Sequence, residues 1–235
     1  MMTDLLLIVP AYNEEASLCA TIQMLRSQPY DFVLVNDGST DRTLQIAREM
    51  DAPVINLPFN QGLAGAFAAG MQYAREQNYA YAMQFDADGQ HLPQYIAPML
   101  EAITRTQADI LVGSRFLGQS MSLSPRNIGS LLIRSMLKLT TGQLLTDPTS
   151  GMRMYNRRLI ELFAARHDLT PEPDTIAYLL RSGFKISECL VTMKERMAGS
   201  SYLSFWNSVK YMLRTSLSIL LIQFVRQPIR KEENA

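Results

Sequence analysis

The chain has 235 residues, with 22 basic and 22 acidic side chains, and its formal net charge is zero. Hydrophobic residues make up 47% of it, a composition that indicates an ordinary globular protein and excludes a disordered or nucleic-acid-binding one. The length is enough for one large domain, or for one domain with an appendage.

The first ten residues contain a short apolar run without a basic flank ahead of it. This pattern is poor for a signal peptide and good for a buried strand. Two cysteines, Cys19 and Cys189, lie far apart in no metal-ligand spacing, which is typical of a reducing compartment. We therefore expect a cytoplasmic protein.

Short apolar runs then alternate with helical patterns over about 110 residues. The runs rich in Val, Ile, Leu and aromatic residues predict strands at Leu5–Val9, Phe32–Val35, Val54–Leu57, Tyr81–Phe85 and Ile110–Gly113. Helices are predicted to begin near Ser17, Asp41, Leu63 and Pro93. Strand and helix in alternation predict an α/β fold, with a mainly parallel sheet flanked by helices.

Polar clusters follow each predicted strand, where ligands bind in sheets of this kind. They span residues 10–15, 36–41, 60–66, 86–90 and 113–115. In the second cluster Gly38 permits a tight turn, and in the third the small residues around Gly65 let a helix N-terminus approach a ligand closely. Taken singly, each cluster reads as a turn and a helix cap. Together they predict one binding edge.

The fourth cluster carries two acids, Asp86 and Asp88, directly after an apolar strand. Side chains two residues apart on an extended chain point the same way, so the two carboxylates can converge on one point. Such a pair suits Mg²⁺ or Mn²⁺, which take oxygen ligands and are usually held by one or two carboxylates plus substrate phosphates. By itself, an Asp-x-Asp pair is more often part of a solvated turn.

In this order, the five clusters resemble the nucleotide-diphosphosugar-binding half of family 2 glycosyltransferases with the GT-A fold, over roughly residues 3 to 200. The resemblance implies a nucleotide site made of Pro10, Tyr12, Glu14, Asp37, Gly65 and Asp86. It also implies a metal and diphosphate site made of Asp86, Asp88 and Gln90, which would hold Mg²⁺ or Mn²⁺. The family often has an acid where this chain has Asn36, which offers a carbonyl but no charge.

The segments 86–93, 113–115 and 147–153 are similar to the branch of the family that loads sugars onto polyprenyl phosphates, including dolichyl-phosphate mannose synthases and bacterial undecaprenyl-phosphate glycosyltransferases. A phosphate acceptor is already a nucleophile and needs cationic positioning more than it needs a base. Arginines occur at matching places, and the resemblance implies acceptor-phosphate contacts from Arg115, Arg126, Arg153 and Arg196. The implied activity is an inverting, metal-dependent hexosyl or N-acetylhexosaminyl transfer for cell-envelope glycan synthesis.

Other functions remain open from the sequence. Transfer to a sugar hydroxyl of a growing polysaccharide would need a base, for which Asp147, Glu172 and Asp174 are candidates, and Asp147 is also the expected organiser of the acceptor loop. A non-catalytic subunit that binds sugar nucleotides is a further alternative. A nucleotidyltransferase is disfavoured, because no Gly-rich basic segment follows the first strand. The base is undetermined among uridine, guanosine and thymidine, with a UDP-sugar favoured by family frequency.

We expect residues 1–199 to form the catalytic domain and residues 200–235 to form an amphipathic helix. Its predicted apolar face consists of Tyr202, Trp206, Val209, Leu213, Leu217, Leu220 and Phe224, and its predicted polar face of Lys210, Arg214 and Ser218. The longest uncharged stretch, Thr215 to Val225, is shorter than the roughly 20 apolar residues that span a bilayer. We expect this helix to attach the protein peripherally to the inner face of the cell membrane, to bind a small membrane-protein partner or to form a homo-oligomer. Packing on the core is the alternative.

Overall fold

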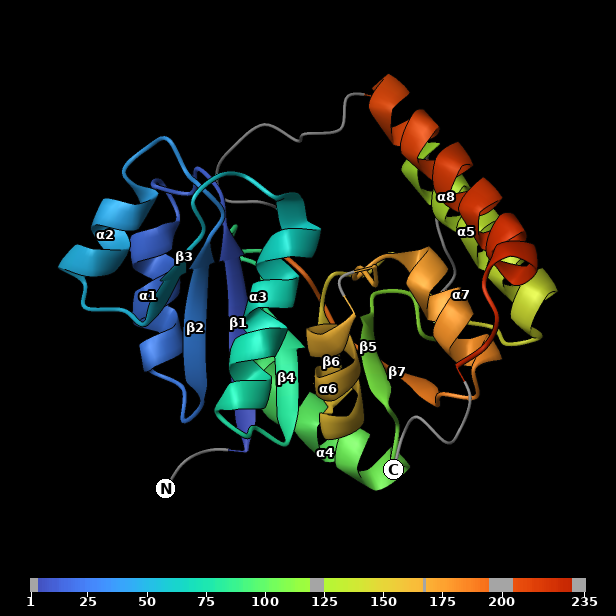
Figure 1. Ribbon diagram of the computed structural model, residues 1–235, viewed down its shortest axis with the longest axis horizontal. Helices are drawn as coiled ribbons and strands as arrows, with labels where there is room; N and C mark the ends of the chain where they lie inside the picture. Colours follow the sequence, from blue (N-terminus) through green and yellow to red (C-terminus); the bar gives the residue numbers. More distant parts are fainter. Residues whose placement is uncertain (1–3, 119–124, 167, 195–204, 230–235) are drawn as a thin grey trace.

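The computed structural model describes residues 4–118, 125–166, 168–194 and 205–229 (Figure 1). Within these ranges a seven-stranded sheet has the order β3-β2-β1-β4-β6-β5-β7. The strands are β1 Leu5–Ala11, β2 Asp31–Asn36, β3 Val54–Asn56, β4 Tyr81–Gln84, β5 Ile110–Ser114, β6 Arg153–Asn156 and β7 Ile186–Leu190. The five predicted strands are confirmed, while β6 and β7 were not predicted.

Helices flank the sheet on both sides. They are α1 Leu18–Arg26, α2 Thr43–Glu49, α3 Gly62–Glu76, α4 Ile96–Thr106 with the preceding 3-10 turn η1 Pro93–Tyr95, α5 Pro125–Thr141, α6 Arg157–Ala165, α7 Pro173–Arg181 and α8 Phe205–Val225. The four predicted helix starts are confirmed to within a few residues. Helices α5, α6 and α7 were not predicted from the sequence.

Strand direction brings the polar clusters to one edge of the sheet. β1 pairs in parallel with β2 and β4, and β2 pairs in parallel with β3. The inserted strand β6 is antiparallel to both β4 and β5, so β5 runs in the same direction as β4. The carboxyl ends of β1, β2, β4 and β5 therefore meet at one edge, as the α/β pattern predicts.

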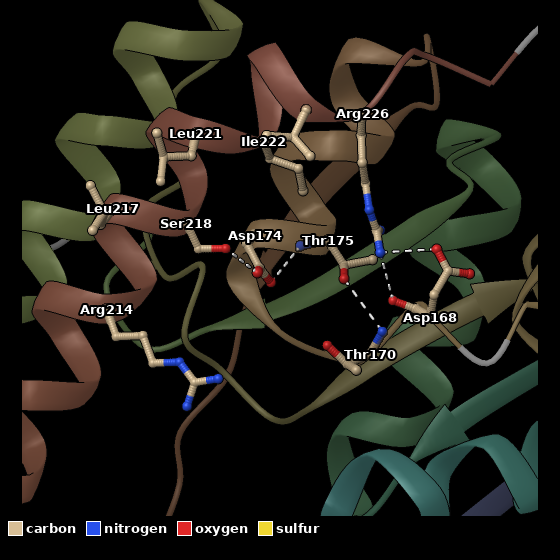
Figure 2. Close-up of a pocket in the computed structure, with 11 residues that line it drawn as sticks. Asp168, Thr170, Asp174, Thr175, Arg214, Leu217, Ser218, Leu221, Ile222 and Arg226 are labelled. Atoms are coloured by element: carbon tan, nitrogen blue, oxygen red, sulfur yellow. Dashed lines mark hydrogen bonds and ion pairs between the residues drawn. The ribbon is translucent and has the colours of Figure 1, made fainter.

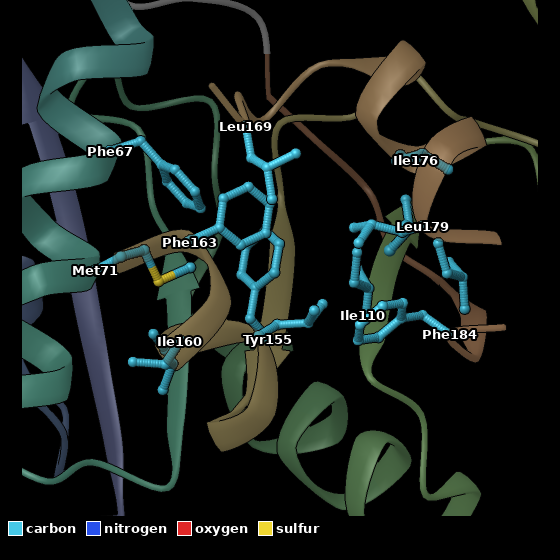
Figure 3. Packing of buried hydrophobic residues seen from close by; sticks show 14 of the residues in the cluster. Phe67, Met71, Ile110, Tyr155, Ile160, Phe163, Leu169, Ile176, Leu179 and Phe184 are labelled. Carbon is cyan, nitrogen blue, oxygen red and sulfur yellow. The ribbon is translucent and has the colours of Figure 1, made fainter. Parts of the chain in front are cut away.

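The alternation of side chains in β1 divides the core into two layers. Leu5, Leu7 and Val9 pack with α1, α2 and α4, whereas Leu6 and Ile8 pack with α3 and α5 to α8 on the other face. In the second layer three aromatic rings, from Phe67, Tyr155 and Phe163, lie with their centroids 5.1 to 5.5 Å apart (Figure 3). Tilted and edge-on ring pairs of this kind add to the free energy gained from burial.

The last helix, α8, lies beside α5 and packs on α7 at one end of the molecule (Figure 1). Its Ile219 and Ile222 are buried in the same core layer, at 0% and 9% exposure. The core therefore includes α8. Within the described parts of the chain, no helix combines the length and apolar character needed to cross a membrane.

The side of α8 that was predicted to be apolar points away from the core. Leu213, Leu217 and Phe224, which were expected to share the apolar face, are 58%, 56% and 80% exposed. Lys210 and Arg214 are exposed with them, because positions three, four and seven apart share one side of a helix. Tyr202 lies outside the described residues. α8 thus packs through one side and presents a mixed apolar and basic side outward.

Two hydrogen bonds from α8 reach acids at the start of α7. The Tyr211 hydroxyl donates to Glu172 Oε2 at 2.5 Å, and the Ser218 hydroxyl donates to Asp174 Oδ2 at 2.6 Å. Burial, followed by the neighbouring Glu172 carboxylate, raises the pKa of Tyr211, so its hydroxyl remains a donor. These contacts tie α8 to the body of the domain.

Replacing Tyr211 by Phe is expected to lower the free energy of unfolding by about 1.5 to 3 kcal/mol, the net value of a hydrogen bond to a charged group. Urea unfolding followed by circular dichroism measures this change. In a Glu172→Gln background the same replacement should cost less, because the acceptor is no longer charged. Equal costs in the two backgrounds would show that the bond contributes nothing specific.

Candidate functional site

A groove of about 600 Å³ lies at the carboxyl ends of β1, β2 and β4. Its lining residues are Pro10, Ala11, Tyr12, Glu14, Asp37, Asn60, Gly62, Leu63, Ala66, Asp86, Ala87 and Asp88. Six residues predicted from the sequence are therefore together. Two others, Gly65 and Gln90, do not line the groove; Gly65 lies on α3, where an added Cβ would meet the side chain of Gln61.

Asp37 fixes one wall of this groove. It is 3% exposed, and its Oδ1 accepts the backbone N–H of Gln61 at 2.7 Å. The next residue, Gly38, has φ +64°, and an added Cβ would lie 2.5 Å from the carbonyl carbon of Phe59. Only glycine fits there. The turn after β2 and the loop before α3 are thereby held against each other, with Asp37 between them.

The loop after β1 is bonded to the loop after β2. Asn13 adopts a left-handed conformation with φ 55°, and its side-chain oxygen accepts the N–H of Thr40 at 2.9 Å. The backbone N–H of Glu14 donates to the Thr43 hydroxyl at 2.8 Å. The Glu14 carboxylate accepts the Ser17 hydroxyl at 2.7 Å. The groove is therefore bounded by loops that are already ordered against one another.

His91 orients Asp86. The backbone N–H of Asp86 donates to His91 Nδ1 at 2.9 Å, so the ring proton is on Nε2, which lies 3.5 Å from Asp86 Oδ2. Gln84 donates to the other carboxylate oxygen at 3.0 Å. His91 is itself buried, at 3% exposure.

Asp86 and Asp88 differ in exposure. The Asp86 side chain is 33% exposed, whereas Asp88 is 3% exposed and its Oδ1 accepts the N–H of Gln90 at 3.0 Å. Among the described residues no group of three or more His, Cys, Asp or Glu side chains is arranged to hold a metal ion. Two carboxylates on a groove fit a hard divalent cation that takes its remaining ligands from water and substrate phosphates.

Gln90 stays a predicted metal ligand, although it does not line the groove. Its side-chain amide donates to the backbone carbonyl of Lys194 at 3.4 Å, and its backbone carbonyl accepts the N–H of Lys194 at 3.0 Å. Gln90 therefore joins the turn after β4 to the segment after β7. Of the predicted metal and diphosphate site, the structure places Asp86 and Asp88 on the groove.

Asp147 is fully buried and bound to Arg115. Arg115 Nε and Nη2 donate to its two oxygens at 2.7 and 2.9 Å, and the Arg115 backbone N–H and the Thr149 hydroxyl add bonds of 3.1 and 3.2 Å. The bond to Asp147 raises the pKa of the Arg115 guanidinium. With four donors on its oxygens, Asp147 is poorly placed to take a proton, which supports a role as loop organiser. Arg115 itself is 32% exposed.

Glu188 on β7 holds the same loop, and the sequence analysis missed it. Its carboxylate accepts the backbone N–H groups of Thr146 and Asp147 at 2.7 to 2.9 Å and the Thr146 hydroxyl at 3.0 Å. An acid inside an otherwise apolar strand was the available signal. Its partners are about 40 residues away in the chain, so nothing local identified them.

Arg153 was wrongly predicted to contact the acceptor phosphate. It is 3% exposed on β6, and its two terminal nitrogens donate to the carbonyls of Pro148 and Pro171, each at 2.8 Å. It joins the Asp147 loop to the turn before α7. Arg196 lies outside the described residues, and Arg126 lies in the first turn of α5, where the side chain is not described. Of the four arginines predicted to contact the acceptor phosphate, Arg115 is therefore the one that the described structure leaves partly exposed and able to do so.

Gly151 brings the loop that contains Asp147 close to the Asp86 carboxylate. A Cβ at this position would lie 3.0 Å from Asp86 Oδ2, closer than ordinary packing allows. We expect Gly151→Ala to displace the Asp86 carboxylate and to lower the activity implied by the sequence resemblance by about tenfold, a loss on the order of 1.4 kcal/mol. Steady-state kinetics with a thermal melt of the same sample would measure this. Wild-type activity in the variant would contradict the close approach.

The two remaining candidate bases are hydrogen-bonded to other groups. Glu172 accepts the Tyr211 hydroxyl, and Asp174 accepts the Ser218 hydroxyl and the Thr175 N–H. Neither acid lines the groove at the sheet edge. Both serve the α7–α8 contact.

Known proteins resemble this chain in sequence. The family model described as Glycosyl transferase family 2 matches residues 6–163. An undecaprenyl-phosphate mannosyltransferase from Micrococcus luteus is 35% identical over 217 residues, covering 85% of this chain and 87% of the relative. A UDP-N-acetylglucosamine–dolichyl-phosphate N-acetylglucosaminyltransferase from Methanococcus voltae is 30% identical over 180 residues, covering 67% and 71%.

Solved structures share the fold. Glucosyl-3-phosphoglycerate synthase from Mycobacterium tuberculosis, in complex with Mn²⁺, UDP-glucose and phosphoglyceric acid, has a TM-score of 0.68 at 18% identity, covering 95% of this chain and 80% of that one. A mannosyltransferase from Pyrobaculum calidifontis, in complex with GDP-mannose and Mn²⁺, has a TM-score of 0.57 at 15% identity, covering 97% and 77%. At these identities the likeness concerns the GT-A-like fold.

Proposed function

Because the chain belongs to glycosyl transferase family 2, we propose that it moves a sugar from a nucleoside-diphosphate sugar to a polyprenyl phosphate of the undecaprenyl type. The named relatives that support this choice of acceptor are transferases to undecaprenyl or dolichyl phosphate. The proposal places the donor in the groove at the sheet edge and the acceptor phosphate beside Arg115.

The proposal rests on the observation that the acids on the acceptor side are already hydrogen-bonded to other side chains. Among the described residues, Asp147 is bound to Arg115, Glu172 to Tyr211 and Asp174 to Ser218. A sugar hydroxyl must lose its proton and needs a base, whereas a phosphate oxygen is already a nucleophile. An acceptor loop that presents an arginine and has no available carboxylate suits the phosphate.

The proposed reaction is a single in-line displacement. The acceptor phosphate oxygen attacks the anomeric carbon as the bond to the nucleoside diphosphate breaks, which inverts that carbon. Asp86 and Asp88 would hold Mg²⁺ or Mn²⁺, which offsets the negative charge of the departing diphosphate. Asp37 and the loop after β1 position the base and ribose. Arg115, oriented by Asp147, holds the incoming phosphate through its remaining N–H groups.

The donor is proposed to be a UDP-sugar carrying a hexosyl or N-acetylhexosaminyl group. The fold accommodates both uridine and guanosine diphosphates, because structural neighbours are bound to UDP-glucose and GDP-mannose. Guanosine and thymidine therefore belong in the test.

We further propose that the protein works peripherally on the inner face of the cell membrane, alone or with a small membrane protein or a second copy. The outward side of α8 supports this, since it exposes Leu213, Leu217, Phe224 and Val225 together with Lys210. A mixed apolar and basic helix face suits the membrane interface.

Transfer assays with a short-chain polyprenyl phosphate and UDP-, GDP- and dTDP-sugars test the proposal. We expect a sugar-phosphate lipid product that forms with Mn²⁺ or Mg²⁺ and disappears with chelator. Product on an oligosaccharide hydroxyl instead would identify the polysaccharide alternative. Donor binding without turnover on either acceptor would identify a non-catalytic subunit.

A further inference from the structure

A second groove, of about 410 Å³, lies between α7, α8 and the segment 168–170 (Figure 2). It shares no lining residue with the groove at the sheet edge. Asp168, Asp174, Arg214 and Arg226 supply its charged groups, and the outward side of α8 supplies most of its apolar wall. None of these residues takes part in the proposed transfer reaction.

The acids in this groove are already hydrogen-bonded, and Asp168 is also ion-paired. Asp168 lies 2.9 Å from both Arg166 and Arg226, and the bond from Arg166 is the main cause that lowers the pKa of Asp168. Asp174 accepts the Ser218 hydroxyl and the Thr175 N–H. A cationic ligand would therefore find no unpaired carboxylate here.

Arg214 differs from these acids because it has no such bonding partner among the described residues. It is exposed on α8 and lines the groove, and among the described residues it has no ion-pair partner. Figure 2 shows its guanidinium away from both acids. Among the described residues Arg214 thus offers an unpaired positive charge, which lies away from both acids of the groove.

A row of apolar side chains leads away from Arg214 along α8. Leu217, Leu221 and Val225 follow at intervals of three and four residues and are 56%, 49% and 79% exposed. Figure 2 shows the first two of them. The row from Arg214 to Val225 extends about 16 Å at 1.5 Å per residue. A cation at one end of an extended apolar row matches a molecule with an anionic head and a long hydrocarbon chain.

We propose that this groove binds an anionic phospholipid, with its phosphate at Arg214 and one acyl chain along Leu217, Leu221 and Val225. The inference rests on the proposed peripheral attachment and deepens it by naming the lipid class that is bound; the phospholipid is not a substrate, and its site is separate from the donor groove. Binding there would hold the domain on acidic membranes, whichever sugar is transferred. It would also cover apolar side chains that are exposed in the described structure.

Co-sedimentation of the full chain with vesicles tests the proposal. We expect tighter binding to vesicles of phosphatidylcholine with phosphatidylglycerol than to phosphatidylcholine alone. Arg214→Gln should weaken binding to the acidic vesicles about fivefold, the value of one basic side chain near such a surface. Arg48→Gln is the matched control, since Arg48 is exposed on α2, and it should bind like wild type.

The apolar row has its own pair of variants. Leu221→Asn should weaken binding about tenfold, whereas Leu139→Asn, at a 72% exposed position on α5 outside the groove, should not. Equal losses from the two would overturn the groove in favour of a broad apolar face. Equal binding of wild type to neutral and acidic vesicles, or wild-type binding by Arg214→Gln, would overturn it as well.

A transfer assay in detergent separates this inference from the proposed function. Arg214→Gln should keep the wild-type KM for dispersed polyprenyl phosphate, and a raised KM would show that the groove holds the acceptor instead. Vesicle binding does not depend on turnover. A protein that binds acidic vesicles as expected but transfers no sugar would contradict the proposed transfer reaction and leave the phospholipid site standing.

Discussion

Replacing Asp88 by Asn is expected to lower the rate of sugar transfer on the order of 10² to 10³-fold at saturating donor. The variant removes one of the two negative charges proposed to hold the metal ion. It retains a side-chain oxygen that can accept the N–H of Gln90, so the turn after β4 should persist. Initial rates over a Mn²⁺ titration, together with calorimetric binding of nucleoside diphosphate, measure the loss.

A matched control is available at Asp51. This residue is exposed in a turn with φ 49°, a conformation that asparagine also adopts readily, and it lies outside the groove. Asp51→Asn should transfer sugar at the wild-type rate. If Asp88→Asn stayed within a few-fold of wild type at saturating metal, the metal assignment would be wrong.

Arg115→Met is expected to affect both stability and the use of the acceptor. Asp147 is fully buried and would lose its bidentate partner, a cost of about 2 to 3 kcal/mol given that Arg115 is partly exposed. The melting temperature should fall by about 5 to 10 °C. kcat/KM for polyprenyl phosphate should fall by about 100-fold, because the phosphate loses a charged hydrogen-bond donor.

The double variant Arg115→Met/Asp147→Asn separates the two effects. Removing the buried charge as well should restore part of the lost stability, while kcat/KM for the acceptor stays low. Recovery of activity together with stability would show that Arg115 acts only through the fold. An unchanged melting temperature in the single variant would contradict the buried pair.

The sequence predicted well where function depends on a local pattern. The apolar run Leu5–Val9 and the acids two residues apart at Asp86 and Asp88 each follow from neighbouring positions in the chain. The structure buries the run as part of β1 and places both acids on the groove at the sheet edge. Parallel pairing makes this convergence almost automatic, because it turns the end of each strand toward the same side.

The sequence predicted poorly where a side chain meets a distant segment. Arg153 looked like a phosphate ligand from its motif, yet its terminal nitrogens are bound to the carbonyls of Pro148 and Pro171. Glu188 gave no local sign that it holds the backbone of Thr146 and Asp147. Hydrogen bonds between remote segments depend on the order of strands in the sheet, and the insertion of β6 between β4 and β5 was not predicted.

The sequence by itself determined the α/β architecture, the binding edge and the pair of carboxylates on it. Only the tertiary structure decided which polar groups remain available for a substrate and which side of α8 faces outward. The physical reason is that availability depends on what a side chain has already bonded, and burial depends on what packs against it. The availability of polar groups and the burial of side chains are both set by contacts among α7, α8 and the Asp147 loop. These three segments are far apart along the chain.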